Sequence, residues 1–387
     1  MSCVTKCLSH TLIHLNLEET VVLEREKSAM EKRGLDVLIA MSPESVAYGI
    51  GCVIPSHFFA RRRHAISVVY LDDAPTLIVA DMEEEHAKNY SSVKDVRSYR
   101  EFLQDPIDLL VDVLKEKGFS HGQIGIELSY IPAIDFKKLR SKLPGLKLIE
   151  CTELFNELYT VKSDKQLSIL RAVAKAAEKA IQEGFERLEV GMTEHDLART
   201  MVSTFYGEGG DGIRLLVVGS GERSSYPNVG PSERVIKNGD LIRVDFLGLK
   251  EYFMSDVCRT AIVGKPSDKQ RQIWNKLVKT EEAILETIEP GVKAFAVYKA
   301  YLKIWKDSGF NPVRFIGHGL GLSTHERPLL SDSDELALQE GMLLCIEPLL
   351  LIPKLEGYHL EDEVLVTRDG YEIVTNIMDT SQLYEIK

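Results

Sequence analysis

The chain has 387 residues, with 47 lysine and arginine residues against 59 aspartate and glutamate residues, so its formal net charge is −12. This length predicts two domains, and the hydrophobic content of 44% is typical of folded globular proteins rather than disordered or fibrous ones. An acidic chain repels phosphate backbones and no long apolar run occurs, so we expect neither a nucleic acid partner nor a membrane span.

The N-terminus and the cysteines indicate the compartment. The segment Met1–Leu17 lacks the basic start and the apolar run of a secretory signal. The six cysteines are scattered and form no Cys-x-x-Cys pair: Cys3, Cys7, Cys52, Cys151, Cys258 and Cys345. We therefore expect reduced thiols, no structural zinc and a cytoplasmic location.

The first 160 residues alternate helix and strand signals. Helices are predicted over Glu18–Arg33, closed by Gly34, and from Asp105 to Gly118. The predicted strands are the apolar runs Leu35–Ala40, Ala65–Leu71, Pro75–Ala80, Gln123–Leu128 and Leu146–Ile149. A short polar turn between the second and the third of these strands predicts a hairpin. This alternation is typical of an α/β domain, which we place at residues 1–160.

A second domain, residues 161–387, begins with a long helix. Ser163 followed by Gln166 is a capping-box signature, and the helix is expected to extend to about Leu188 with apolar residues along one face. Ser267 followed by Gln270 opens another long helix in the same way.

These two helices start an internal repeat with a period near 100 residues. Three segments match three later ones in order: Leu188–Gly191 with Ile288–Gly291, Val217–Gly221 with Phe315–Gly319, and Gly239–Asp245 with Gly341–Glu347. A second helix follows the first segment of each half, at Thr193–Tyr206 and Ala294–Lys306. The pattern predicts a duplicated helix-helix-strand unit with pseudo-twofold symmetry, and hence an α+β fold for the whole chain.

Carboxylates interrupt the apolar strands of this repeat. In the predicted strand Leu241–Leu247, Arg243 and Asp245 lie on the face opposite to the apolar residues. The next predicted strand, Phe253–Val257, carries Asp256. A charge buried in such surroundings without a partner costs several kcal/mol, so each of these strands needs a compensating cation or a raised carboxyl pKa.

The repeat relates the carboxylates in pairs. Asp245 matches Glu347, and Asp256 matches Glu361. A pseudo-twofold axis would bring all four together, which requires cations between them. His318, between two glycines, is the natural nitrogen ligand. Oxygen-rich ligands with one histidine suit Mn²⁺, Co²⁺, Fe²⁺ or Zn²⁺, and four carboxylates can bridge two ions.

This ordered set resembles the metal ligands of the pita-bread metallopeptidases, which include aminopeptidase P, prolidase and creatinase-type enzymes. The residues that carry the resemblance are Asp245, Asp256, His318, His325, Glu347 and Glu361. The resemblance implies a pita-bread catalytic domain after a creatinase-N-like domain, and a homodimer. It also implies two divalent ions, with Mn²⁺ or Co²⁺ favoured over Zn²⁺ or Fe²⁺. Asp245 would bind in bidentate fashion, Asp256 and Glu361 would bridge, and His318 and Glu347 would be terminal ligands.

The implied reaction is hydrolysis of an Xaa-Pro amide bond by a metal-activated water molecule, in an aminopeptidase or dipeptidase. Glu347 would accept the proton of the attacking water, and His325 would donate to the tetrahedral intermediate or bind substrate. Two further readings stay open. One is a creatinase-like or ectoine-hydrolase-like enzyme that cleaves a C–N bond in a small non-peptide amide. The other is a binding module without metal.

Departures from the family pattern concern the substrate. Asn228 stands where the peptidases usually have histidine, and His359 stands where they often have arginine. Leu247 replaces a usual glycine. We expect Asn228, His325 and His359 to bind substrate. The basic stretch Arg61–His64 is a further candidate, in which Arg63 would reach a neighbouring subunit's site and bind a substrate carboxylate.

Overall fold

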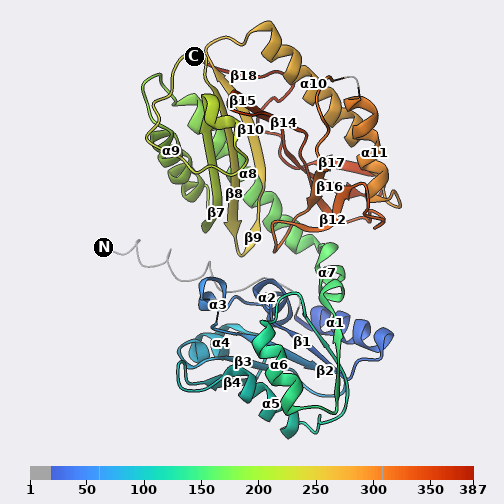
Figure 1. Cartoon of the computed structure of the whole chain (residues 1–387). Helices are drawn as coiled ribbons and strands as arrows, with labels where there is room; N and C mark the ends of the chain where they lie inside the picture. The colour runs from blue at the N-terminus through green and yellow to red at the C-terminus, as the bar shows by residue number, and fades with distance from the viewer. Residues whose placement is uncertain (1–18, 61, 307) are drawn as a thin grey trace. The chain divides into compact units, whose positions relative to one another are not determined.

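A computed structural model describes residues 19–60, 62–306 and 308–387, which form two compact units divided between Tyr159 and Thr160 (Figure 1). Several features of the sequence analysis lie outside the described residues: Met1–Leu17 with Cys3 and Cys7, Glu18, and Arg61. The four cysteines among the described residues, Cys52, Cys151, Cys258 and Cys345, are buried free thiols. Across the described part of the chain, every helix is too short or too polar to cross a membrane.

The first unit is built on a six-stranded sheet with the order β4-β3-β2-β1-β5-β6. The strands are β1 (Val37–Ala40), β2 (Ile66–Tyr70), β3 (Thr76–Ala80), β4 (Asp95–Tyr99), β5 (Gly122–Ile126) and β6 (Leu146–Glu150). β2 and β3 pair antiparallel, which confirms the predicted hairpin, and β1, β5 and β6 are parallel. All four residues of β1 are buried because helices cover both faces of the sheet.

The helices of this unit are α1 (Glu19–Arg33), α2 (Pro43–Ile50), α3 (Pro55–Phe59), α4 (Glu84–Tyr90), α5 (Pro106–Glu116), α6 (Ala133–Lys142) and α7 (Thr152–Thr160), with a 3₁₀ turn η1 (Asp81–Glu83). In α5, Ile107 and Leu110 share one core with Val37 and Ile39 of β1. The helices α1 and α2 contact β1 and β2 outside that core, on the other face. The sequence analysis missed the helices α2, α3, α4, α6 and α7 and the strand β4. Few residues of α6 are buried, so its sequence carries only a weak apolar periodicity from which a helix could be predicted.

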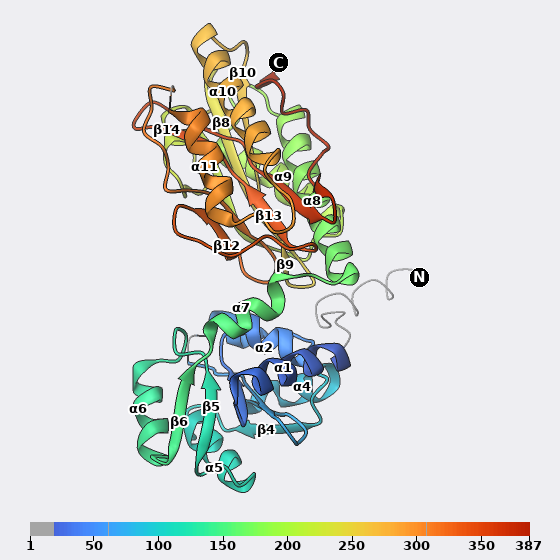
Figure 2. The ribbon, with the colours of Figure 1, turned by 90° about the vertical axis from the view of Figure 1, so that its right-hand side faces the viewer.

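The second unit contains the predicted duplication (Figures 1 and 2). Its first half consists of α8 (Asp164–Glu186), α9 (Glu194–Gly207), β7 (Gly212–Ser220), β8 (Leu241–Lys250) and β10 (Val257–Val263). Its second half consists of α10 (Asp268–Leu285), α11 (Ala294–Trp305), β11 (Phe315–Gly319), β13 (Leu343–Ile346) and β16 (Asp362–Thr367). The strands pair in the same order in both halves, β7-β8-β10 and β11-β13-β16, and a helix pair packs on each sheet.

Local details repeat as well. Both α8 and α10 begin with a capping box in which serine and glutamine bond each other's backbone. Gly191 and Gly291 have φ of 102° and 90°, and Gly239 and Gly341 have φ of 88° and 87°. Matching left-handed glycines at matching turns confirm the duplicated architecture predicted from sequence.

The remaining strands extend the two sheets or form a separate hairpin. They are β9 (Phe253–Met254), β12 (Glu326–Ser331), β14 (Leu349–Ile352), β15 (Glu356–His359), β17 (Gly370–Ile373) and β18 (Tyr384–Ile386), with a 3₁₀ turn η2 (Gly221–Ser225). The predicted strand Phe253–Val257 is wrong, because β9 ends at Met254 and β10 begins at Val257. Asp256 lies in the link between them, where its N–H donates to Glu363 Oε1 at 3.0 Å instead of to a neighbouring strand.

Candidate metal centre and cavity

The second unit holds a cavity of about 740 Å³. Its polar lining is Arg214, Asn228, Arg243, Asp245, Asp256, His318, Thr324, His325, Glu347, His359 and Glu361. Its apolar lining includes Leu215, Pro227, Leu247, Val313, Phe315, Leu349 and Leu351. Every candidate site residue from the sequence except Arg63 therefore lines one cavity.

Arg63 belongs to the first unit, where its guanidinium pairs with Glu101. In the same stretch, His64 is buried, with Nε2 at 3.0 Å from Asp135 Oδ2. Its packing against Asp135 identifies His64 as a partnered interior histidine of that unit.

Strand alternation places Asp245 in the cavity. On β8, Ile242, Val244 and Phe246 point into the core, so Asp245 points to the opposite side and is partly exposed there. Its carboxyl group lies near that of Asp256, which enters from the link before β10, so that the charge of Asp245 raises the pKa of Asp256. A carboxyl group on β8 and one in that link thus converge.

The second half supplies two further carboxylates. Glu347 directly follows β13, and its N–H donates to Ile316 O at 2.9 Å. Glu361 directly precedes β16, and its N–H donates to Cys258 O at 3.2 Å. This last bond joins Glu361 to β10 of the first half, so the two halves meet at the carboxylates.

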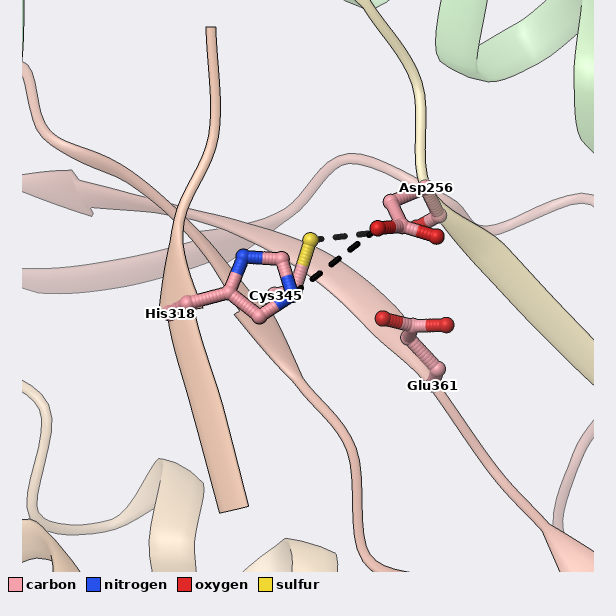
Figure 3. Close-up of side chains that lie close together, drawn as sticks. All are labelled: Asp256, His318, Cys345 and Glu361. Atoms are coloured by element: carbon pink, nitrogen blue, oxygen red, sulfur yellow. Dashed lines mark hydrogen bonds and ion pairs between the residues drawn. The ribbon is translucent and has the colours of Figure 1, made fainter. Parts of the chain in front are cut away.

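His318 is oriented by its own backbone. Its Nδ1 lies 3.0 Å from Gly319 O, and burial lowers the pKa of the ring, so the neutral ring carries its proton on Nδ1. The lone pair of Nε2 then faces Asp256 Oδ2 at 3.8 Å and Glu347 Oε1 at 3.5 Å. Figure 3 shows His318 and Asp256 with Cys345 and Glu361, converging from separate strands.

Among the described residues, no lysine or arginine forms an ion pair with the four carboxyl groups, and the charge of Arg243 lowers the pKa of Asp245 without a direct contact. Burial raises the pKa of Asp245, Asp256, Glu347 and Glu361, and neighbouring carboxylates raise that of Asp245, Asp256 and Glu361 further. Within the described residues, Asp245 Oδ1, Glu347 Oε1 and Glu361 Oε2 are buried without a hydrogen-bond partner. Converging acids with unused oxygens beside an imidazole lone pair fit divalent cations.

Two further histidines line the cavity. Burial lowers the pKa of His359 to about 4, so its ring is neutral, and neither ring nitrogen has a hydrogen-bond partner among the described residues. Its Nε2 lies 3.4 Å from Glu347 Oε2 and 4.0 Å from Glu361 Oε2. The ring of His325 stands across that of His318, with 4.3 Å between the ring centroids.

The sequence analysis missed two thiols at the site. Cys345 lies with Asp256, His318 and Glu361, and Cys258 lies with Asp245 and His359, in groups whose potential ligand atoms are within 4.8 Å of one another. The Cys345 thiol is 3.9 Å from the backbone oxygen of Asp256. Burial raises the pKa of both thiols well above its usual value. Each thiol stands two residues from an acid of the cluster, a spacing visible in the sequence.

Arg243 is the other residue that the sequence analysis left without a role. It is 2% exposed and lines the cavity. Its Nε donates to Ser224 O at 3.0 Å, and its Nη2 donates to the backbone oxygens of Tyr226 and Pro227, the latter at 2.6 Å. The guanidinium thus holds the segment that ends at Asn228.

Two family models match the chain. A model described as metallopeptidase family M24 matches residues 168–368, and a model of the creatinase/prolidase N-terminal domain matches residues 23–159. Together they cover both compact units.

Individual relatives extend this similarity over most of the chain. An Xaa-Pro dipeptidase of Pyrococcus furiosus is 29% identical over 358 residues, which are 91% of this chain and 97% of the relative. A crystal structure of a prolidase from Pyrococcus horikoshii is 26% identical, with a TM-score of 0.82 over 92% of this chain and 99% of that one. An X-Pro aminopeptidase from Thermotoga maritima, 23% identical, shares the fold, with a TM-score of 0.84 over 94% of this chain and 99% of that one.

Proposed function

The chain belongs to metallopeptidase family M24, and from that premise we propose that it hydrolyses the Xaa-Pro amide bond of small peptides with two divalent metal ions. Relatives named Xaa-Pro dipeptidase and prolidase support the substrate class. The observation that carries the proposal is the convergence of four carboxyl groups, three of them on buried residues, and the Nε2 of His318 on one cavity.

In this proposal the ions are held by Asp245, Asp256, His318, Glu347 and Glu361. When bound, they would supply Lewis acidity and lower the pKa of a water molecule, with Mn²⁺ or Co²⁺ favoured over Zn²⁺ or Fe²⁺. The unpartnered oxygens of Asp245, Glu347 and Glu361 support this assignment. The neutral His318, protonated on Nδ1, presents the lone pair that a metal requires.

Glu347 and His325 would move protons and stabilise charge. Glu347 takes a proton from the attacking water and delivers it to the proline nitrogen as the C–N bond breaks. His325, whose ring lies across from that of His318, donates a hydrogen bond to the carbonyl oxygen as that oxygen gains negative charge. Hydrolysis is then balanced: the hydroxyl group joins the carbonyl carbon and the proton joins the nitrogen.

The apolar wall of the cavity suits a proline ring. Val313, Phe315, Leu349 and Leu351 line it, and burial of the pyrrolidine methylenes against them stabilises the complex by about 0.8 kcal/mol per methylene. A tertiary amide also brings no N–H that would need an acceptor in this apolar surrounding.

A substrate panel tests the proposal. The purified chain, loaded with Mn²⁺, Co²⁺ or Zn²⁺, is offered Ala-Pro, Ala-Pro-Ala and a small cyclic amide. We expect cleavage of an Xaa-Pro bond that stops on chelation of the metal and returns when the metal is restored. Rejection of every Xaa-Pro compound by the metal-loaded protein would refute the proposal.

A second candidate is hydrolysis of a C–N bond in a small non-peptide amide, by a creatinase-like or ectoine-hydrolase-like enzyme. The observation that favours it is Asn228, which lines the cavity at the place where the resembling peptidases have a histidine. Asparagine donates a hydrogen bond but carries no proton. Cleavage of the cyclic amide alone would select this candidate. An Asn228→His variant that gains Xaa-Pro cleavage would then identify the cause.

The other expectations from sequence remain proposals. We propose a catalytic domain at 161–387 after a creatinase-N-like domain at 1–160, a homodimer and a cytoplasmic location. The role of Arg63 at a neighbouring subunit's site likewise remains a proposal, which an unchanged Michaelis constant in an Arg63→Ala variant would refute.

A further inference from the structure

Arg243 is a buried cation without a carboxylate partner. It is 2% exposed, and its hydrogen bonds go only to the backbone oxygens of Ser224, Tyr226 and Pro227. Across the described residues, no carboxylate lies within ion-pair distance of its guanidinium. Taking a guanidinium out of water costs several kcal/mol, and neutral carbonyl groups offset only part of that cost. The surroundings of Arg243 therefore favour the binding of an anion.

The guanidinium also retains unused donors at the cavity. Nε and Nη2 are engaged by the three carbonyl groups, whereas Nη1 makes no hydrogen bond to any described residue. Arg243 lines the same cavity as Asn228 and His359. Nη1 thus keeps two N–H groups of a permanently charged guanidinium for a ligand, and a carboxylate oxygen is an acceptor that forms a charge-assisted hydrogen bond with such a group.

The internal repeat shows that the fold does not require this arginine. Because Asp245 matches Glu347, Arg243 matches Cys345, a small buried residue that needs no ion pair. Because Asp256 matches Glu361, His359 matches Met254, which is also buried. Arg243 and His359 are therefore polar groups of the cavity that the other half of the repeat lacks.

Charge balance points the same way. Four carboxylates and two divalent ions would neutralise one another in the proposed centre. The Arg243 charge would then stay uncompensated beside it until an anionic ligand binds. Asn228 directly follows Pro227, whose backbone oxygen Arg243 holds, and both Asn228 and Arg243 line the cavity.

We propose that Arg243, through Nη1 and with Asn228 beside it, binds the C-terminal carboxylate of the substrate and so restricts the enzyme to dipeptides. This inference rests on the proposed Xaa-Pro hydrolysis and names its substrate class. Arg243 is then a binding residue in addition to the support that it gives to the segment 224–227.

The test compares Ala-Pro with its C-terminal amide in the metal-loaded protein. We expect the wild type to have a Michaelis constant for Ala-Pro about 10- to 100-fold below that for the amide, the effect of one charge-assisted hydrogen bond. Arg243→Met should raise the constant for Ala-Pro more than that for the amide and so remove most of the difference between the two substrates. Arg243→Lys, which keeps the positive charge, should retain part of the preference.

Two controls address the other sources of a carboxylate effect. Arg214→Met removes an exposed arginine of the same cavity; a loss of preference there and not in Arg243→Met would overturn the assignment. Glu-Pro amide carries its only carboxylate on a side chain; cleavage of it as efficient as that of Ala-Pro would also overturn it. If Arg243→Met and Arg243→Lys weaken the binding of Ala-Pro and of its amide equally, Arg243 has only a structural role and the proposal is refuted.

A binding measurement separates this inference from the proposed function. The thermal unfolding midpoint is recorded with Ala-Pro or Ala-Pro amide, which reports binding without turnover. Suppose that no Xaa-Pro bond is cleaved, yet Ala-Pro raises the midpoint more than its amide does, and only when Arg243 is present. The carboxylate site is then supported and the proposed hydrolysis is refuted. If both are cleaved with equal Michaelis constants, the reaction stands and the carboxylate site fails.

Discussion

The two halves of the second unit agree in their backbone and differ in the side chains of the cavity. Both present a helix pair on three strands, left-handed glycines at the same turns, and two acids that lie within or directly beside neighbouring strands. They differ at Arg243 against Cys345 and at Met254 against His359. The comparison teaches that the four acids proposed to hold a pair of metal ions are duplicated, whereas the fifth proposed ligand, His318, is not, because it matches Ser220. Arg243 and His359, which are also not duplicated, are what an asymmetric substrate would need.

The strongest test of the duplicated set exchanges matching acids for amides of the same shape. We expect Glu347→Gln to lower turnover of Ala-Pro by about 10²- to 10⁴-fold, because it removes both a proposed metal ligand and the proton acceptor. Asp245→Asn should lower metal content similarly. Turnover and metal content per chain, measured on the same preparation, check both variants.

The same variants should not harm the metal-free fold. Each replaced group is a buried carboxyl beside others of like charge, so its removal relieves repulsion. With metal removed, the unfolding midpoint of Glu347→Gln should therefore equal or exceed that of the wild type. Turnover within tenfold of the wild type would refute the role of Glu347, whereas a lower metal-free midpoint would refute the account of its charge.

An ion pair that ties the two halves together gives the largest expected loss of stability. Lys162 Nζ lies 2.6 Å from Glu326 Oε2, with the two side chains 2% and 1% exposed. Lys162 precedes the first half, and Glu326 follows His325 in the second. Lys162→Met leaves a buried charge unpaired, which should cost about 3–5 kcal/mol in the free energy of unfolding. Urea unfolding measures it.

The double variant Lys162→Met, Glu326→Gln is the control for this pair. It removes both charges, so it should recover a large part of the loss. Glu326 Oε1 also accepts the N–H of Leu322 at 2.7 Å, which supports the turn before His325. The single variant should for that reason lower turnover as well. A loss of stability below about 1 kcal/mol would show that the pair is not buried in solution.

Matching glycines give a graded comparison between the halves. Gly219 and Gly317 are equivalent in the repeat, and a Cβ would meet Arg223 O at 2.7 Å in the first and Cys345 O at 2.1 Å in the second. Gly219→Ala should destabilise by about 1–3 kcal/mol through this clash. Gly317→Ala should cost more and should also disturb the adjacent His318. Thermal unfolding compares the two.

Gly191 and Gly291 are the controls for backbone conformation alone. A Cβ at either meets nothing within 4 Å, but both have φ near the left-handed region, at 102° and 90°. Alanine should cost about 1–2 kcal/mol at each. Unequal costs at these two positions would contradict the equivalence of the halves.

The duplication and the acids were accessible to sequence reasoning because each leaves a mark along the chain. Asp245 interrupts an alternating strand, Glu347 interrupts an apolar run, and the repeat relates them. The link that carries Asp256 was predicted as strand because its neighbours are apolar. The hydrogen bond that determines its conformation joins the N–H of Asp256 to Glu363, a residue 107 positions away. Long-range partners of this kind leave no local pattern.

Arg243 shows the same limit more sharply. Its place on the polar face of β8 was predicted, but its meaning depends on which partners it lacks. A sequence shows that an arginine is present; only the packed structure shows three carbonyls on Nε and Nη2 and no carboxylate within reach among the described residues. The helix α6 was missed for a different reason, because its apolar residues show only weak helical periodicity. Its prediction did not depend on distant contacts.

The last prediction concerns a buried acid outside the repeat. Glu26, on α1 of the first unit, is 1% exposed, and burial raises its pKa to about 8 from an ordinary value of 4.5. Between these values the folded chain keeps a proton that the unfolded chain releases. Stability contributed by the neutral form is therefore complete below about pH 4.5 and is lost as the pH rises toward 8.

Glu26→Gln should remove this dependence, because glutamine stays neutral at every pH. The free energy of unfolding of the wild type, measured with urea, should fall between pH 5 and pH 8 more steeply than that of the variant. The expected difference is about 1.4 kcal/mol for each pKa unit of the shift. Glu26 Oε2 has no hydrogen-bond partner among the described residues, so the exchange to an amide nitrogen sacrifices no bond there. Parallel pH profiles would place Glu26 in water, whereas a flatter variant would establish that a lone buried acid in this chain keeps its proton where the clustered acids would yield theirs to metal.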